Sequence, residues 1–106
     1  RDNIHSYDLV NAFWHVFKAP RIAEVYNIGG GRHANCSMLE AIRLAEEITG
    51  LEFNWDYSNT NRVGDHIWWV SDISRFRSHY PDWRFEHNLK DIMQAVIDGQ
   101  AERLEV

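Results

Sequence analysis

The sequence has little cysteine and little positive charge, and it has no long apolar run. Its single cysteine, Cys36, excludes an internal disulfide framework and fits a reducing, cytoplasmic compartment. Eleven lysines and arginines stand against sixteen acidic residues, for a net charge of −5. We therefore expect no nucleic-acid partner and no membrane partner, and any anionic ligand must be held by individual arginines. No stretch approaches the roughly 20 apolar residues of a membrane span.

Metal and thiol chemistry are both poorly supported by the spacing of their ligands. No two of the six histidines are three or four residues apart on an expected helix, and Cys36 has no second cysteine as a partner. We therefore expect no metal site. A thiol hydrolase using Cys36 with His33 is an alternative, because a thiol just before a helix can act as a nucleophile. A small buried cysteine is the simpler expectation.

Three segments have the apolar spacing of an amphipathic helix, and a fourth, short helix is expected from a cap and a proline stop. Pro20 and Pro81 are expected to end two of them. Ser37 and Glu40 form a capping box that begins another, and Gly50 is placed for its left-handed C-cap. The expected helices are residues 9–17, residues 38–49, residues 73–80 with Asp72 as the cap, and residues 89–99.

Two segments have the pattern of a β-strand, and a short extended segment at residues 3–5 precedes them. Residues 24–28 are rich in β-branched and aromatic side chains. Residues 51–57 alternate apolar and polar positions, so their aromatic side chains would share one face of a strand. Strands that alternate with helices predict an α/β fold with short parallel strands.

The stretch "NIGGGRHANCSMLEA" (residues 27–41) admits two interpretations. Gly29, Gly31 and Ala34 fit the G-x-G-x-x-G/A fingerprint of dinucleotide binding. That fingerprint requires the helix to begin within the motif, whereas the capping box places the helix start at Ser37, three residues past Ala34. The second interpretation is a turn that needs a positive φ, for which glycine costs least.

The stretch "NTNRVGDHIWW" (residues 59–69) is more informative. Arg62 and Asp65 flank Gly64 in a predicted loop. A guanidinium matches phosphate oxygens and a carboxylate accepts hydrogen bonds from sugar hydroxyls, so the two could hold one ligand. The alternative is an exposed ion pair. Trp68 and Trp69 beside them could contact a base or sugar ring, although tryptophans more often belong to a core.

Three motifs follow one another in the order "RDNIHSYDL", "EVYNIGGG" and "NRVGD", and a terminal helix comes after them. Because of this order, the whole chain resembles the C-terminal third of an NAD-dependent nucleotide-sugar epimerase/dehydratase. These enzymes belong to the extended short-chain dehydrogenase/reductase family. The strings "RDNIHSYD" and "GDHIWWVSD" resemble its CDP-paratose/CDP-tyvelose 2-epimerase group. The resemblance implies that residues 1–106 are a single substrate-binding lobe and the C-terminal portion of a Rossmann-like fold.

The resemblance also implies roles for individual residues. Arg1 and Arg62 match the two arginines that contact the substrate diphosphate, and Asp65 matches the carboxylate that holds the nucleotide ribose. His5 and Asp8 match positions that we interpret as structural, fixing a strand-to-helix corner. The glycine turn matches a late strand end rather than the cofactor fingerprint. The implied ligand is a nucleotide-diphosphate sugar, and the implied partners are the chain's own N-terminal Rossmann domain and a second copy in a homo-oligomer.

The chain departs from the family because it lacks the catalytic machinery. No tyrosine is followed four residues later by lysine, and the N-terminal Gly-rich loop of the family is absent. The chain begins at Arg1 rather than at methionine, so we expect a piece of a longer isomerase. NAD would bind to the parent, and this segment alone would be inactive, with no catalytic or cofactor-binding residue. The alternative is a free-standing interaction module descended from such an enzyme, with its exposed sheet edge covered by a partner.

Overall fold

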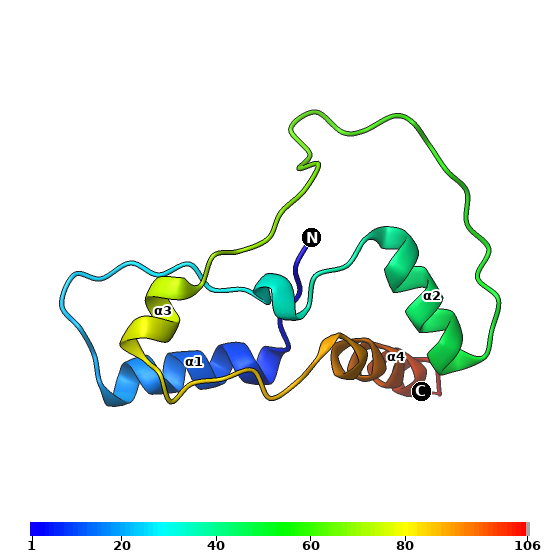
Figure 1. Ribbon diagram of the computed structural model, residues 1–106. Coiled ribbons are helices and arrows are strands. Elements are labelled where there is room, and N and C mark those ends of the chain that lie inside the picture. Colours follow the sequence, from blue (N-terminus) through cyan, green and yellow to red (C-terminus); the bar gives the residue numbers. More distant parts are fainter. Residues whose placement is uncertain (106) are drawn as a thin grey trace.

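The computed structural model describes residues 1–105 and is built from helices. The elements are, in order, α1 (Ser6–Lys18), the short 3-10 helix η1 (Gly31–His33), α2 (Met38–Thr49), α3 (Ser74–His79) and α4 (Leu89–Glu105) (Figure 1). Helices account for 48% of the residues and strand for 2%, and residues 1–105 contain no sheet. The predicted α/β fold, a Rossmann-like portion with parallel strands, is therefore wrong.

Helix α1 forms where the apolar spacing predicts it. It begins earlier than the stripe because the His5 side chain caps it, with Nδ1 accepting from the backbone N–H of Tyr7 at 3.0 Å. It ends at Lys18, just before Pro20. The apolar face of α1 is only partly buried by the rest of the chain, because Ala12 is buried whereas Phe17 is 74% exposed.

Helix α2 confirms both of its predicted boundaries. The hydroxyl of Ser37 accepts from the backbone N–H of Glu40, and the Glu40 carboxylate accepts from the backbone N–H of Ser37. Gly50 adopts the left-handed C-cap with φ of 69°. Both signals lie within one turn of the helix end, so they act without help from the rest of the chain.

Helix α4 does not end near Gly99 as predicted, because it continues to Glu105. A glycine inside a helix costs only about 1 kcal/mol relative to alanine, which neighbouring turns can offset. One such contribution is the hydrogen bond from the Gln94 amide to Asp98, at 2.9 Å and one turn apart. Helix α4 packs against α2 (Figure 1).

Helix α3 packs over α1 around an aromatic core (Figure 1). It is one residue shorter at each end than predicted, and its N-cap is Ile73 rather than the predicted Asp72. The Asp72 carboxylate nevertheless accepts from the backbone N–H of Ser74 at 3.0 Å. The indole N–H of Trp83 donates to the backbone oxygen of Asp8 at 3.0 Å. The buried members of the core are Ala12, Ile73, Phe76, Tyr80 and Trp83.

The side chain of Asp8 fixes the start of α1 to the segment before α4. It is 0% exposed, and its two oxygens accept from the backbone N–H groups of Glu86 and His87 at 3.0 and 3.2 Å. A buried carboxylate needs such donors to offset its lost hydration. The structural roles predicted for His5 and Asp8 are thus confirmed, although the corner that they fix leads to residues 86–87 and not to a strand.

The predicted strands at residues 24–28 and 51–57 do not form. A strand needs backbone partners, and residues 1–105 offer none to either segment. Residues 51–69 instead run away from the helices as a long loop (Figure 1). The alternating aromatic residues of this exposed loop face solvent, with Trp55 51% exposed and Tyr57 77% exposed.

The overall arrangement is open. The radius of gyration is 16.7 Å, whereas a compact domain of this length has about 13 Å. The accessible surface is 8638 Å², which exceeds the roughly 6,200 Å² of a compact protein of this mass by about 2,400 Å². Surface that a compact domain would bury is therefore exposed. Across the described part of the chain, none of the helices combines the length and apolarity needed to cross a bilayer.

Candidate functional site

One groove contains all three residues predicted to bind substrate. Arg1, Arg62 and Asp65 line a hollow of about 640 Å³ between the N-terminal segment, the start of α2 and the exposed loop. Arg1 and Arg62 are separated by most of the chain, so only the fold brings them together. Their role in binding a ligand stays a prediction.

A tight turn in the exposed loop orients Arg62 toward Asp65. The backbone N–H of Asp65 donates to the oxygen of Arg62 at 3.2 Å, and Gly64 adopts a φ of 82°, which favours glycine. The turn places the two side chains face to face. Nε of Arg62 lies 3.0 Å from Oδ2 of Asp65, and Nη2 lies 3.0 Å from Oδ1. The contact is a bidentate pair.

Arg1 approaches the same carboxylate from the N-terminal segment, with its Nη2 3.9 Å from Oδ1 of Asp65. Backbone hydrogen bonds hold this segment, because Arg1 and Cys36 exchange two of them, at 3.0 and 3.1 Å. On its other side, the N–H of Asp2 donates to the oxygen of Trp69 at 3.0 Å. Residues 1–3 therefore lie between residues 34–36 and 69–71.

Arg62 and Asp65 form the exposed ion pair that the sequence left open as an alternative. The two arginines still have N–H donors that an anion could use. Asp65 neutralises one of the two arginines, so the trio carries one net positive charge. A guanidinium has five N–H donors, and Nη1 of Arg62 has no partner within residues 1–104. The Arg62 side chain is 82% exposed, and such surface pairs contribute only about 0–1 kcal/mol, so it can turn toward a ligand at small cost.

Trp68 and Trp69 do not belong to the core, contrary to the more common role of tryptophan. They are 69% and 50% exposed. The ring of His66 lies 4.9 Å from that of Trp69, centroid to centroid. Neither tryptophan lines the groove, so their contact with a base or sugar ring stays a prediction.

The glycine turn does not fit a dinucleotide. The N–H of Gly31, which the fingerprint would offer to a pyrophosphate, donates to Oδ2 of Asp2 at 2.9 Å. A Cβ on Gly30 would lie 1.6 Å from the backbone oxygen of Asn3, so the glycine is needed for close packing of two backbones. Gly31 has a φ of 54°, which confirms the alternative of a turn that needs positive φ.

Asp2 accepts the hydrogen bond that the fingerprint would offer to a phosphate. Its Oδ2 also accepts from the backbone N–H of Ser71, at 2.8 Å. Partial burial of the carboxyl group opposes ionisation, but the hydrogen bonds from Ser71 and Gly31 outweigh it and lower the pKa of Asp2 below its usual value. Neither spacing nor periodicity predicts this role, because the partners of Asp2 lie 29 and 69 positions away in the sequence.

His33 is directed away from any nucleophilic role with Cys36. Its Nε2 donates to the backbone oxygen of His87 at 2.8 Å, and its ring stacks on Phe85 at 4.5 Å. The thiol of Cys36 is half-buried and accepts from the amide of Asn3 at 3.5 Å. Among the described residues, no group of three or more histidine, cysteine or acidic side chains is placed to hold a metal ion.

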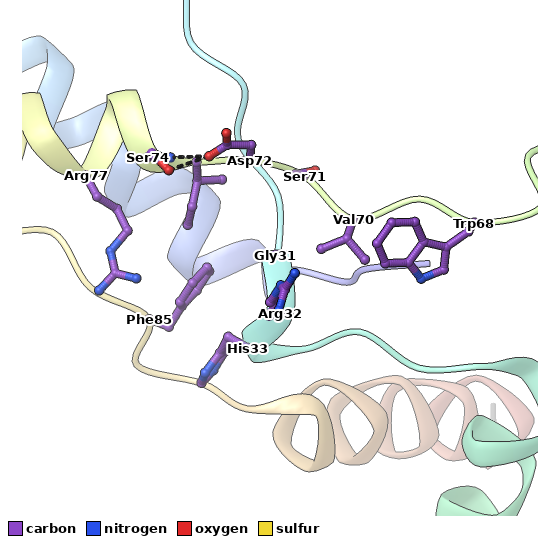
Figure 2. A pocket seen from close by; sticks show the side chains of 11 residues that line it. Gly31, Arg32, His33, Trp68, Val70, Ser71, Asp72, Ser74, Arg77 and Phe85 are labelled. Atoms are coloured by element: carbon purple, nitrogen blue, oxygen red, sulfur yellow. Dashed lines mark hydrogen bonds between the residues drawn. The ribbon is translucent and has the colours of Figure 1, made fainter.

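A second hollow, which the sequence analysis did not anticipate, lies between η1, α3 and the segment leading to α4. Its volume is about 440 Å³. Figure 2 shows Arg32 and Arg77 on either side of it in this view, with Phe85 and His33 between them. Two single exposed arginines give no signal in a sequence, so only the fold could relate them.

The chain was also compared with protein-family models, with curated proteins and with solved structures, and none of the three comparisons finds a match. The resemblance to nucleotide-sugar epimerases is therefore an expectation from the motifs alone.

Proposed function

We propose that this chain is the nucleotide-diphosphate-sugar-binding part of an NAD-dependent sugar epimerase. The observation that carries the proposal is the meeting of Arg1, Arg62 and Asp65 in one groove of about 640 Å³. Arg1 comes from one motif that resembles the family, and Arg62 and Asp65 come from another. The groove volume lies in the range of small-molecule sites.

In this proposal the groove residues bind and orient the substrate. Arg1 and Arg62 hold the two phosphates, because two guanidinium groups match the charge and the fork geometry of a diphosphate. Asp65 then gives up part of its contact with Arg62 and accepts from the ribose hydroxyls. No residue of this chain is assigned to hydride or proton transfer, because the Tyr-x-x-x-Lys pair is absent.

The exposed surface supports a further domain of the parent enzyme as partner. The chain exposes about 2,400 Å² more surface than a compact protein of its mass. An excess of this size matches an obligate interface. We propose that the N-terminal Rossmann domain of the parent, which binds NAD, covers it. The free thiol of Cys36 is compatible with a cytoplasmic enzyme.

Titration of the 106-residue chain with CDP-glucose and UDP-glucose, followed by calorimetry, tests the proposal. We expect weak binding that Arg62→Ala weakens by about tenfold or more, because a charge-assisted hydrogen bond is lost. The free energy of unfolding should change by less than about 0.5 kcal/mol, as for other surface substitutions. Arg43→Ala, which removes an exposed arginine of α2 outside the groove, is the matched control and should bind like the wild type.

The alternative function is a free-standing interaction module, and the same exposed surface is the observation that favours it. It predicts that neither nucleotide sugar binds and that a second copy or another protein covers the apolar surface. Equal affinity of the wild type and Arg62→Ala would remove Arg62 from the proposed site and favour this alternative.

A further inference from the structure

We propose that the second hollow binds the phosphate group of a small molecule between Arg32 and Arg77. This site is separate from the groove of Arg1 and Arg62, and the proposal does not depend on the proposed function. Its two arginines come from η1 and α3, elements that are far apart in the sequence (Figure 2).

The charges that line the hollow favour an anion. Arg32 and Arg77 are exposed, and neither makes an ion pair within residues 1–104. The acidic group in the lining is Asp72, whose carboxylate accepts from the backbone N–H and the hydroxyl of Ser74. Those two hydrogen bonds lower the pKa of Asp72, so it stays ionised and engaged with Ser74. Two guanidinium groups therefore line one hollow in a molecule whose net charge is −5.

Three other donors in the lining are already used, so the charged donors that face the hollow are those of the arginines. The N–H groups of Gly31 and Ser71 both donate to Asp2. Nε2 of His33 donates to the backbone of His87. Guanidinium groups offer a planar fork that matches phosphate oxygens, which favours phosphate over a halide or another single-atom anion.

The wall between the two arginines is ordered by aromatic packing. The ring of Phe85 stacks on His33 with an interplanar angle of 2°, and its other contact is edge-on with the buried Trp83 at 4.9 Å. This packing joins the hollow to the aromatic core. The volume of about 440 Å³ suits a small molecule rather than a protein surface.

Titration with inorganic phosphate at constant ionic strength, monitored by amide chemical shifts, tests the site. We expect saturable shifts at residues 31–33 and 74–77. Arg32→Ala and Arg77→Ala should each weaken binding by about tenfold or more. Arg77→Lys should recover only part of the affinity, because lysine keeps the charge and loses the fork.

Two controls distinguish this site from other sources of binding. Arg43→Ala removes the same charge from α2 and should leave the phosphate affinity unchanged. Arg62→Ala should also leave it unchanged, so failure of the proposed function and failure of this inference can be told apart. Shifts confined to residues 61–66 and lost in Arg62→Ala would overturn the inference. Equal weakening of phosphate binding in Arg43→Ala would overturn it too, because the effect would then come from the net charge of the protein and not from this hollow.

Discussion

The core around Trp83 and the exposed loop contain the same kinds of aromatic residue and differ in what surrounds them. Trp83 is 2% exposed, and both its ring and its N–H have partners. Trp55 is 51% exposed. The core residues come from helices and short connections that fold back on each other, whereas the loop has no neighbouring strand. An aromatic residue is therefore buried here only where other elements of this chain reach it.

The largest expected effect is the loss of the Trp83 side chain. Trp83→Ala should lower the free energy of unfolding by about 3–5 kcal/mol, because it opens a cavity in the aromatic core. Trp55→Ala in the exposed loop should change it by less than about 0.5 kcal/mol. Urea unfolding followed by circular dichroism measures both.

A milder variant keeps this comparison measurable if Trp83→Ala does not fold. Trp83→Phe retains most of the ring volume and removes the N–H that donates to Asp8. An intermediate loss is expected. Equal effects at positions 83 and 55 would contradict the contrast between the two regions.

The next effect concerns Asp8, which ties the core to the start of α4. Asp8→Ala should cost about 2–3 kcal/mol, because two partly buried backbone N–H groups lose their acceptor. Asp8→Asn keeps one acceptor oxygen and should cost less. Faster amide exchange at Glu86 and His87 would locate the damage, and unchanged exchange in Asp8→Ala would contradict the role given to its carboxylate.

The smallest effect concerns Asp2, which holds the end of the exposed loop to the glycine turn. Because its pKa is lowered in the folded chain, Asp2 stabilises the fold above the usual carboxyl pKa of about 4. This contribution is lost as the pH falls through the lower folded value.

We expect the contribution of Asp2 to be about 1 kcal/mol or less, since solvent screens a partly exposed carboxylate. Asp2→Asn should remove this part of the acid dependence, measured as amide protection of Gly31 and Ser71 between neutral pH and pH 3. An unchanged acid profile in Asp2→Asn would assign the effect to other carboxylates.

Signals confined to one helical turn predicted the structure well. The capping box at Ser37, the left-handed Gly50 and the stop before Pro20 each depend on residues within a few positions. The strand signals failed because a strand is completed by backbone that lies elsewhere, and residues 24–28 and 51–57 find none in the described chain. The periodicity itself is present, with its apolar face left in solvent.

Contacts over long sequence separations could not be predicted from single motifs. The carboxylate of Asp8 accepts from backbone N–H groups that lie 78 and 79 positions later in the chain. Arg32 lies in the glycine stretch and Arg77 in no motif, and nothing in the sequence relates the two. The groove of Arg1, Arg62 and Asp65 was anticipated only through the resemblance to a family, since spacing alone suggested Arg62 with Asp65 and left Arg1 without a role.

Amide hydrogen exchange of the exposed loop, with and without saturating CDP-glucose or UDP-glucose, tests the proposed nucleotide-sugar groove most directly. If the groove binds the diphosphate, exchange at residues 61–66 should slow by about tenfold or more while residues 51–57 keep exchanging freely, because a bound ligand protects only the segment that it holds. Unchanged exchange at residues 61–66 in the presence of ligand, or slowing that persists in Arg62→Ala, would contradict it.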